Sequence, residues 1–423
     1  MKWLLEGGRL LCPETGLDTT GDLLLEDGTI GAVGQVESPG EVQRMDCRGL
    51  VVSPALVDLE AQLCDPGMPW REDLESGSAA AAAGGFTAVL VSPATLPVLD
   101  EPTIVRELIE RATSQARIKI LVAGALTRGL EGQELSEIGL LAEAGAAAIS
   151  HGGRYLSNTA TLRNALLYAR PFGTPLLLRA GDPYLDADGS MHEGRISTTI
   201  GLRGISDAGE EAGCARLAAL SRACDTPLHI TGITTARGVE ILRRAREEGV
   251  AITGSTGSHH LFLTDESVMS SGYDTSHRMQ PPLRSESDRQ ALLAALVDGT
   301  LSGAATFHTP WTRAEKEHEF ERAEAGAIGL QTAFSEVFTA TGDLAVALRT
   351  LSAGPAGVLG LERRLEKGAP AEIIVIDPEA SYTLEQGDLL SKCQNSPVLG
   401  QRLQGLVRAT FHDGKPVFEA RTS

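Results

Sequence analysis

The stretch that decides the fold is residues 53–67, which read SPALVDLEAQLCDPG. Its apolar first half predicts a buried strand, and polar residues begin where that strand ends. Residues two apart on a strand point to the same side, so a D-x-H-x-H run in this place would aim two imidazoles at one metal ion. The two positions hold Glu60 and Gln62 instead. The segment therefore predicts a strand end without the histidine pair of a metal site.

This strand is the first of eight short apolar runs that favour β-structure. The runs are residues 51–58, 86–93, 119–125, 146–150, 175–179, 227–232, 251–256 and 303–307. Amphipathic segments lie between them, with apolar residues at three- and four-residue steps, at 103–114, 208–224, 236–248 and 287–297. Such alternation is typical of parallel βα units, and eight units predict an α/β fold with a (β/α)8 barrel of the TIM type.

The two ends of the chain follow a different pattern. Residues 1–50 and 371–423 each contain short strands around a hairpin signal, Glu26-Asp-Gly28 and His412-Asp-Gly414. Neither end is long enough to form a core alone. We therefore expect both termini to join in one small β-sandwich domain, residues 1–53 plus 360–423, beside a barrel of residues 54–359.

Composition limits the classes of partner. The formal net charge is −19 over 423 residues, which argues against nucleic acid and anionic membrane surfaces because both require clustered Lys and Arg. The six cysteines form no C-x-x-C pair, and no apolar run is long enough for a signal peptide or a membrane span. A cytoplasmic protein with reduced thiols is expected.

Motifs across nearly the whole chain resemble those of the dihydroorotases, in the amidohydrolase superfamily, and specifically the long bacterial type. These motifs are residues 75–77, 84–87, 191–194, 259–265, 281–284, 315–316, 329–332 and 395–397. The resemblance implies the barrel and the terminal β-domain described above. It also implies where the metal ligands and substrate-binding groups of an active relative would fall.

The residues at those implied positions differ from the family pattern. The first strand should carry two histidines and an arginine, the second an asparagine, the fourth an acidic bridging ligand, the fifth and sixth a histidine each, and the eighth an aspartate. The corresponding residues are Glu60, Gln62, Cys64, Ala94, His151 within the run 150–153, Arg179, Gly232 and Phe307. From these changes we expect no metal, no other cofactor and no catalytic residues. The chain is predicted to be a non-catalytic homologue, or pseudoenzyme, rather than an enzyme.

Some polar residues remain on the predicted rim, namely Glu60, His151, Arg179 and His308. Glu60, His151 and His308 could form an alternative three-ligand metal site, or they could fill the pocket with hydrogen bonds. Cys64 could be a nucleophile if a neighbour such as Arg179 lowered its pKa, although an ordinary thiol is the simpler interpretation.

Three further residues are interpreted as structural. His259 and His260 should not form a ligand pair, because adjacent residues of a strand point to opposite sides. Asp58 is expected to support the mouth of the barrel.

Three functions are compatible with this sequence. The leading hypothesis, implied by the resemblance, is a structural or regulatory subunit that forms a hetero-oligomer with the catalytic chain of aspartate transcarbamoylase in pyrimidine biosynthesis. The alternative is a cyclic amide or ureide hydrolase with a modified metal site. The third is a sensor in which Arg179 binds the carboxylate of a pathway acid.

Overall fold

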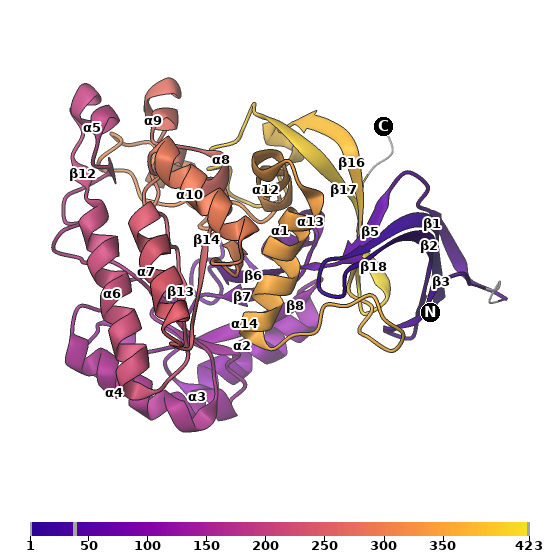
Figure 1. The fold of residues 1–423 in the computed structure, drawn as a ribbon, viewed down its shortest axis with the longest axis horizontal. Helices are drawn as coiled ribbons and strands as arrows, with labels where there is room; N and C mark the ends of the chain where they lie inside the picture. Colours follow the sequence, from indigo (N-terminus) through magenta and orange to yellow (C-terminus); the bar gives the residue numbers. More distant parts are fainter. Residues whose placement is uncertain (1, 37–39, 421–423) are drawn as a thin grey trace.

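The computed structural model describes residues 2–36 and 40–420. It has two parts, a barrel of parallel strands surrounded by helices and a sheet domain beside it that contains segments from both ends of the chain (Figure 1). No helix within these described ranges is long and apolar enough to cross a membrane.

The barrel contains eight parallel strands that neighbour one another in chain order. They are β6 (Leu56–Ala61), β7 (Phe86–Val91), β8 (Lys119–Ala125), β9 (Ala148–Ser150), β10 (Leu176–Arg179), β13 (Leu228–Thr231), β14 (Ile252–Gly257) and β15 (Gly303–Ala305). A bridge between Ala61 and His308 brings the last strand back to the first. The predicted TIM-type barrel is therefore confirmed. Each strand lies inside its expected range or within two residues of it, except the first, which was expected at residues 51–58 and is observed at Leu56–Ala61.

Helices cover the outside of the barrel and its two ends. The long ones are α1 (Leu74–Ala83), α2 (Pro102–Gln115), α4 (Thr159–Ala169), α6 (Asp207–Cys224), α7 (Ala236–Glu247), α10 (Glu286–Val297) and α12 (Ala333–Thr341). The short ones are α3 (Ile138–Glu143), α5 (Arg195–Ile200), α8 (Ser258–Phe262), α9 (Glu266–Ser270), α11 (Arg313–Lys316), α13 (Leu344–Leu348) and α14 (Gly354–Leu359). Two short strands, β11 (Met191–His192) and β12 (Gly204–Ile205), pair outside the barrel.

The sheet domain joins the two termini in a single sheet. Its strands are β1 (Lys2–Cys12), β2 (Leu17–Glu26), β3 (Thr29–Gly34), β4 (Gln43–Asp46), β5 (Val51–Pro54), β16 (Ile373–Thr383), β17 (Arg402–His412) and β18 (Lys415–Glu419). Buried side chains from both ends, such as Leu5, Leu23, Ile373 and Phe411, form one apolar cluster. Since apolar burial stabilises each half only in the presence of the other, neither terminus has a separate core. The exact boundaries of the two domains remain a prediction.

The first predicted strand, 51–58, is corrected by the structure to two strands. β5 pairs with β1 and β16 in the sheet domain, and β6 pairs with β7 in the barrel. The exchange occurs within one residue, because the Ala55 N–H donates to Glu372 O and the Leu56 N–H donates to Gly85 O, both at 2.9 Å. A continuous apolar run cannot reveal this change of partner.

Candidate functional site

The mouth of the barrel, at the carboxyl ends of the strands, is where barrels of this type carry their functional groups. A cavity of about 150 Å³ lies there, and Glu60, Gln62, Gly153, Arg179 and Phe307 are among the residues that line it. Small-molecule sites typically measure roughly 300–1,000 Å³. The mouth cavity is therefore narrow, and the reason is the arrangement of its side chains.

Arg179, the last residue of β10, occupies the centre of the mouth. Its Nη2 atom lies 3.1 Å from Glu60 Oε1, and its Nη1 atom donates to Gln280 O at 2.5 Å. The guanidinium carbon lies 4.6 Å from the centre of the Phe307 ring, a distance typical of a cation–π contact. The ion pair is buried, with the side chains of Arg179 and Glu60 only 5% and 14% exposed. A carboxylate ligand could reach both Nη atoms only if Arg179 released these partners.

Two glycines allow this close packing. A Cβ atom at Gly232 would lie 3.4 Å from Phe307 Cζ and 3.5 Å from Arg179 Nε, and one at Gly153 would lie 3.0 Å from Glu60 Oε1. Gly232 also has a φ of +70°, which side chains rarely adopt. Glu60, Arg179, Gly232 and Phe307, four positions that the resemblance assigns to metal ligands, thus meet and pack against one another.

The other positions taken from the resemblance lie around this cluster. The Gln62 N–H donates to His308 O at 2.8 Å and helps to close the barrel. The Cβ atom of Ala94 lies against Gly152, where an added Cβ would be 3.1 Å away. Cys64 is buried, and burial raises the pKa of its thiol to about 12. The thiol is therefore neutral near pH 7, which argues against the nucleophile interpretation.

Of the rim residues, His151 is separated from the mouth cavity. It is buried in a small space beside Arg154, Leu178 and Arg216. Burial, together with the charge of Arg154, lowers the pKa of its imidazole to about 4. His151 is therefore a neutral residue at physiological pH and does not join Glu60.

His308 also faces a different group. Its Nδ1 atom accepts hydrogen bonds from the N–H groups of Gly329 and Leu330, at 3.2 and 3.4 Å. Its Nε2 atom lies 3.4 Å from Glu72 Oε2, and both side chains are almost completely buried. His308 lines the mouth cavity together with Glu60, but its ring nitrogens face Glu72 and two backbone N–H groups, and among the described residues it forms no metal-binding group with Glu60 and His151.

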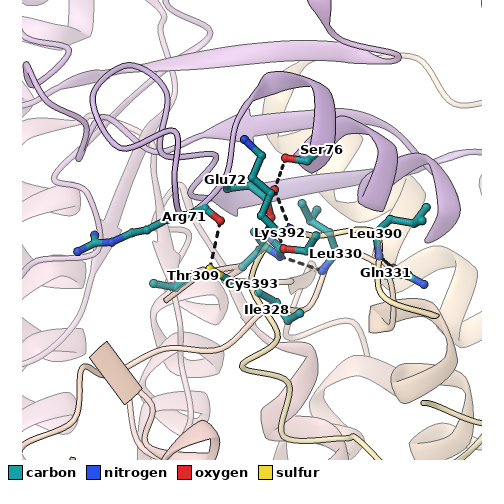
Figure 2. Close-up of polar contacts among 12 residues, drawn as sticks. Arg71, Glu72, Ser76, Thr309, Ile328, Leu330, Gln331, Leu390, Lys392 and Cys393 are labelled. Carbon is teal, nitrogen blue, oxygen red and sulfur yellow. Dashed lines mark hydrogen bonds and ion pairs between the residues drawn. The ribbon is translucent and has the colours of Figure 1, made fainter. Parts of the chain in front are cut away.

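Glu72 was not identified from the sequence. Figure 2 shows this carboxylate beside the hydroxyl of Ser76 and beside Lys392, whose backbone N–H donates to it across a long chain separation. The hydroxyl of Ser391 also donates to it. Burial alone would raise the pKa of Glu72, but hydrogen bonds from His308, Ser391 and Ser76 hold it below the usual value. Glu72 links the start of α1 to the C-terminal segment, and no local motif marks it because its partners are distant in sequence.

Asp58, His259 and His260 make structural contacts, but the expectation that the two histidines lie on a strand is wrong. Asp58 accepts from Thr306 N and Oγ1 at 2.7 and 2.8 Å and so ties the first strand to the last. The two histidines lie on helix α8 rather than on a strand, because β14 ends at Gly257. His259 Nδ1 is 2.7 Å from Glu336 Oε2, and His260 Nε2 is 3.0 Å from Pro281 O.

The donor set of the mouth does not fit a metal ion. Among the described residues, no three His, Cys, Asp or Glu side chains are grouped so that they could hold one. The centre is instead occupied by Arg179, whose guanidinium keeps its charge and would repel a divalent cation. No reaction step through zinc can therefore be built from these side chains.

Solved structures with this architecture define the class of the fold. An L-hydantoinase (dihydropyrimidinase) from Arthrobacter aurescens has a TM-score of 0.87 at 20% identity, and the match covers 99% of this chain and 96% of that one. A dihydropyrimidinase from Brevibacillus agri has a TM-score of 0.83 at 18% identity, covering 99% and 95%. At such low identity these similarities establish the fold alone, a parallel α/β barrel with a sheet domain beside it.

Sequence relatives establish the family. Residues 49–237 match the model described as "Dihydro-orotase-like". A protein named dihydroorotase from Geobacter metallireducens is 38% identical over 425 residues, covering 99% of this chain and 100% of the relative. One of the same name from Anaeromyxobacter dehalogenans is 39% identical over 421 residues, covering 98% and 97%. The chain belongs to the dihydroorotase family.

These comparisons contradict the prediction that the chain is not an enzyme. Relatives at 38% identity over the full length carry the name of an enzyme, and the solved structures of the same fold are hydrolases. The prediction is accordingly corrected: the chain belongs to a family whose members carry the name of an enzyme.

Proposed function

We propose that this dihydroorotase-family chain assembles with the catalytic chain of aspartate transcarbamoylase and supports its activity in pyrimidine biosynthesis. The observation that carries the proposal is the mouth of the barrel, where Arg179, Glu60 and Phe307 bind one another. These contacts join residues at the ends of β6 and β10 and just after β15, and so support the shape of this face. The fold is shared over the full length of the chain, and assembly with a partner depends on that shape and on the surface that it presents.

An exposed apolar segment near the mouth is a candidate contact surface for this role. Tyr184 and Leu185, on the loop that follows β10, are 82% and 50% exposed. Aromatic side chains are enriched in protein interfaces because they bury a large apolar area at a small cost in conformational entropy. The loop lies on the same side of the barrel as the end of β10 that carries Arg179.

The test combines gel filtration, light scattering and a carbamoyl-transfer assay on this chain, the transcarbamoylase and their mixture. The proposal predicts one co-eluting complex with higher transferase activity than the separate enzyme. Replacement of both Tyr184 and Leu185 by Ser should weaken the complex, whereas Phe172→Ser, at an exposed aromatic residue in the short 3-10 turn Arg170–Phe172 that follows α4, should not. Two independent peaks with unchanged transferase activity would exclude the proposal.

A second candidate function follows from the name shared by the relatives, which is hydrolysis of dihydroorotate or a similar cyclic amide. It predicts ring opening by the purified chain alone, measured by product analysis. Glu60→Gln, which changes the single carboxylate on Arg179, should then lower the turnover, and Tyr273→Ser at an exposed site should not. Absence of turnover with dihydroorotate and hydantoin, with and without added zinc, would exclude this candidate.

A further inference from the structure

A larger cavity lies at the opposite end of the barrel from the mouth. It measures about 660 Å³, within the range of roughly 300–1,000 Å³ found for small-molecule sites. Its walls contain the amino-terminal residues of three neighbouring strands, Leu176 of β10, Leu228 of β13 and Ile252 of β14. We call this space, as lined by these strands and by α14, the base cavity. Neither the family comparisons nor the functions proposed above involve it.

Helix α14 forms one wall of the base cavity, and its glycine residues leave space there. This helix contributes Gly354, Gly357 and Val358 to the lining. A Cβ atom added at Gly357 would have no atom within 4 Å, so the space beside this residue is empty. Ala169 and Ala251 also line the cavity, and most of its wall is apolar. Such a wall favours an apolar body in the ligand, because burial of apolar surface is the main source of its binding energy.

The floor of the base cavity is polar but neutral. His229 and Thr253 point into the barrel interior and are joined by a hydrogen bond of 2.8 Å between Nδ1 and Oγ1. The other ring nitrogen, Nε2, lies 2.8 Å from Ser255 Oγ. Burial lowers the pKa of His229 to about 3, so the imidazole is uncharged near pH 7. The floor therefore offers no charge that would repel or attract an ion.

The rim supplies the only charges of the site. Arg170 and Arg246 line the base cavity, and its lining contains no Asp or Glu among the residues that the structure describes. Arg246 Nη1 donates to two backbone carbonyls, Gly299 O at 2.6 Å and Thr300 O at 2.8 Å. Because a carbonyl carries no formal charge, these partners do not neutralise the guanidinium. Arg170 pairs with Asp225, whose side chain is 84% exposed. Arg246, which forms no ion pair among the residues that the structure describes, therefore supplies the unpaired positive charge of this rim in a chain of net charge −19.

We propose that the base cavity is a binding site for a small organic molecule that has an apolar ring system and one anionic group. The ring system occupies the space beside Gly357 and Ala251, and the anionic group lies at the rim with Arg246 and Arg170. The cavity is remote from the mouth, where barrels of this type carry out their reactions, so the bound molecule acts as an effector rather than as a substrate.

The test uses two fluorescent probes that share one ring system. 8-Anilinonaphthalene-1-sulfonate carries an anionic group, and N-phenyl-1-naphthylamine is its neutral counterpart. Both should bind the folded full-length chain with a stoichiometry of one. Gly357→Leu, which fills the cavity, should abolish binding of both probes. The matched control, Gly387→Leu, also has open space around its Cβ but lies outside the cavity, and it should leave binding unchanged.

The charge is tested by Arg246→Gln. Loss of a hydrogen bond to a charged group should weaken the binding of the anionic probe about tenfold and leave the binding of the neutral probe unchanged. Equal effects on both probes would overturn the assignment of an anionic ligand. Binding that persists in Gly357→Leu, or no saturable binding to the unmodified chain, would overturn the site. Self-association that Gly357→Leu abolishes, without probe binding, would identify the cavity as a contact between copies. Thermal unfolding of each variant establishes that it is folded.

Discussion

The two ends of this barrel differ in how their polar groups are satisfied. At the mouth, Arg179 and Glu60 are buried and paired, and about 150 Å³ remains. At the base, Arg170 and Arg246 stand at an exposed rim, where Arg170 has only the exposed Asp225 as its ion-pair partner and Arg246 has backbone carbonyls, and about 660 Å³ of mostly apolar space is open behind them. Buried charges need partners, whereas exposed charges are satisfied by water. The mouth has therefore closed on itself, while the base can still accept a ligand.

The largest expected effect comes from breaking the pair at the mouth. Glu60→Ala leaves the Arg179 charge buried without its carboxylate, and we expect the free energy of unfolding to fall by about 3 kcal/mol. Asp225→Ala removes the exposed partner of Arg170 at the base and should cost less than about 1 kcal/mol. Urea denaturation of both variants measures the difference. Equal losses would show that the two ends do not differ in this way.

The buried carboxylate beneath the mouth should make stability depend on pH. Burial raises the pKa of Asp58 to about 7, against 3.8 for the free group. Between these values the folded chain retains a proton that the unfolded chain has lost, so this contribution to stability decreases as pH rises and is gone above the folded pKa. The variant Asp58→Asn has no carboxyl group at this position, so this contribution to the pH dependence is absent from it.

The variant should therefore gain stability relative to the natural chain as pH rises from 4 to 7, by about 3 kcal/mol in all. Urea denaturation of both proteins at each pH gives this difference and cancels the contributions of other groups. Parallel curves over that range would contradict the prediction.

A smaller effect is expected from the aromatic residue at the mouth. Phe307→Leu keeps an apolar side chain but removes the ring that lies over Arg179, and about 1 kcal/mol should be lost. A double-mutant cycle with Arg179→Met isolates the contact, since its coupling energy should account for most of that loss. A coupling energy near zero would mean that the ring only fills space.

The smallest effect, with the opposite sign, is expected at the base. Gly357→Ala adds a methyl group in open space on α14, and alanine favours a helix over glycine by roughly 0.5–1 kcal/mol. The variant should be more stable by about that amount in thermal unfolding. A loss of stability would indicate that the base is already filled in solution.

The sequence predicted most of the barrel because its signals are local. Apolar runs and amphipathic spacing located the eight strands and the helices α2, α6, α7 and α10 within a few residues. The two hairpins between β2 and β3 and between β17 and β18 were found from Asp-Gly turns. The split at Ala55 was missed because both halves of the run are apolar and buried, and only their distant hydrogen-bond partners differ.

The site was predicted less completely. Spacing and resemblance identified Glu60, Arg179 and Phe307 as members of one mouth, but the ion pair between the first two depends on side-chain directions that a sequence does not specify. His151 and His308 were placed on the rim and in fact face separate neighbours. Glu72 was missed because its partners other than Ser76 lie more than two hundred residues away.

By itself, the sequence determined the family, the order of the strands and the identity of the residues at the positions that the resemblance assigns to metal ligands, because each of these is a property of local pattern or of residue identity. Only the tertiary structure decided which of the replacing side chains meet, that Arg179 closes the mouth, and that a cavity remains at the base. The physical reason is that pairing and empty volume depend on distances between groups from different strands. Those distances exist only after the chain has folded and the entropy of closing its loops has been overcome.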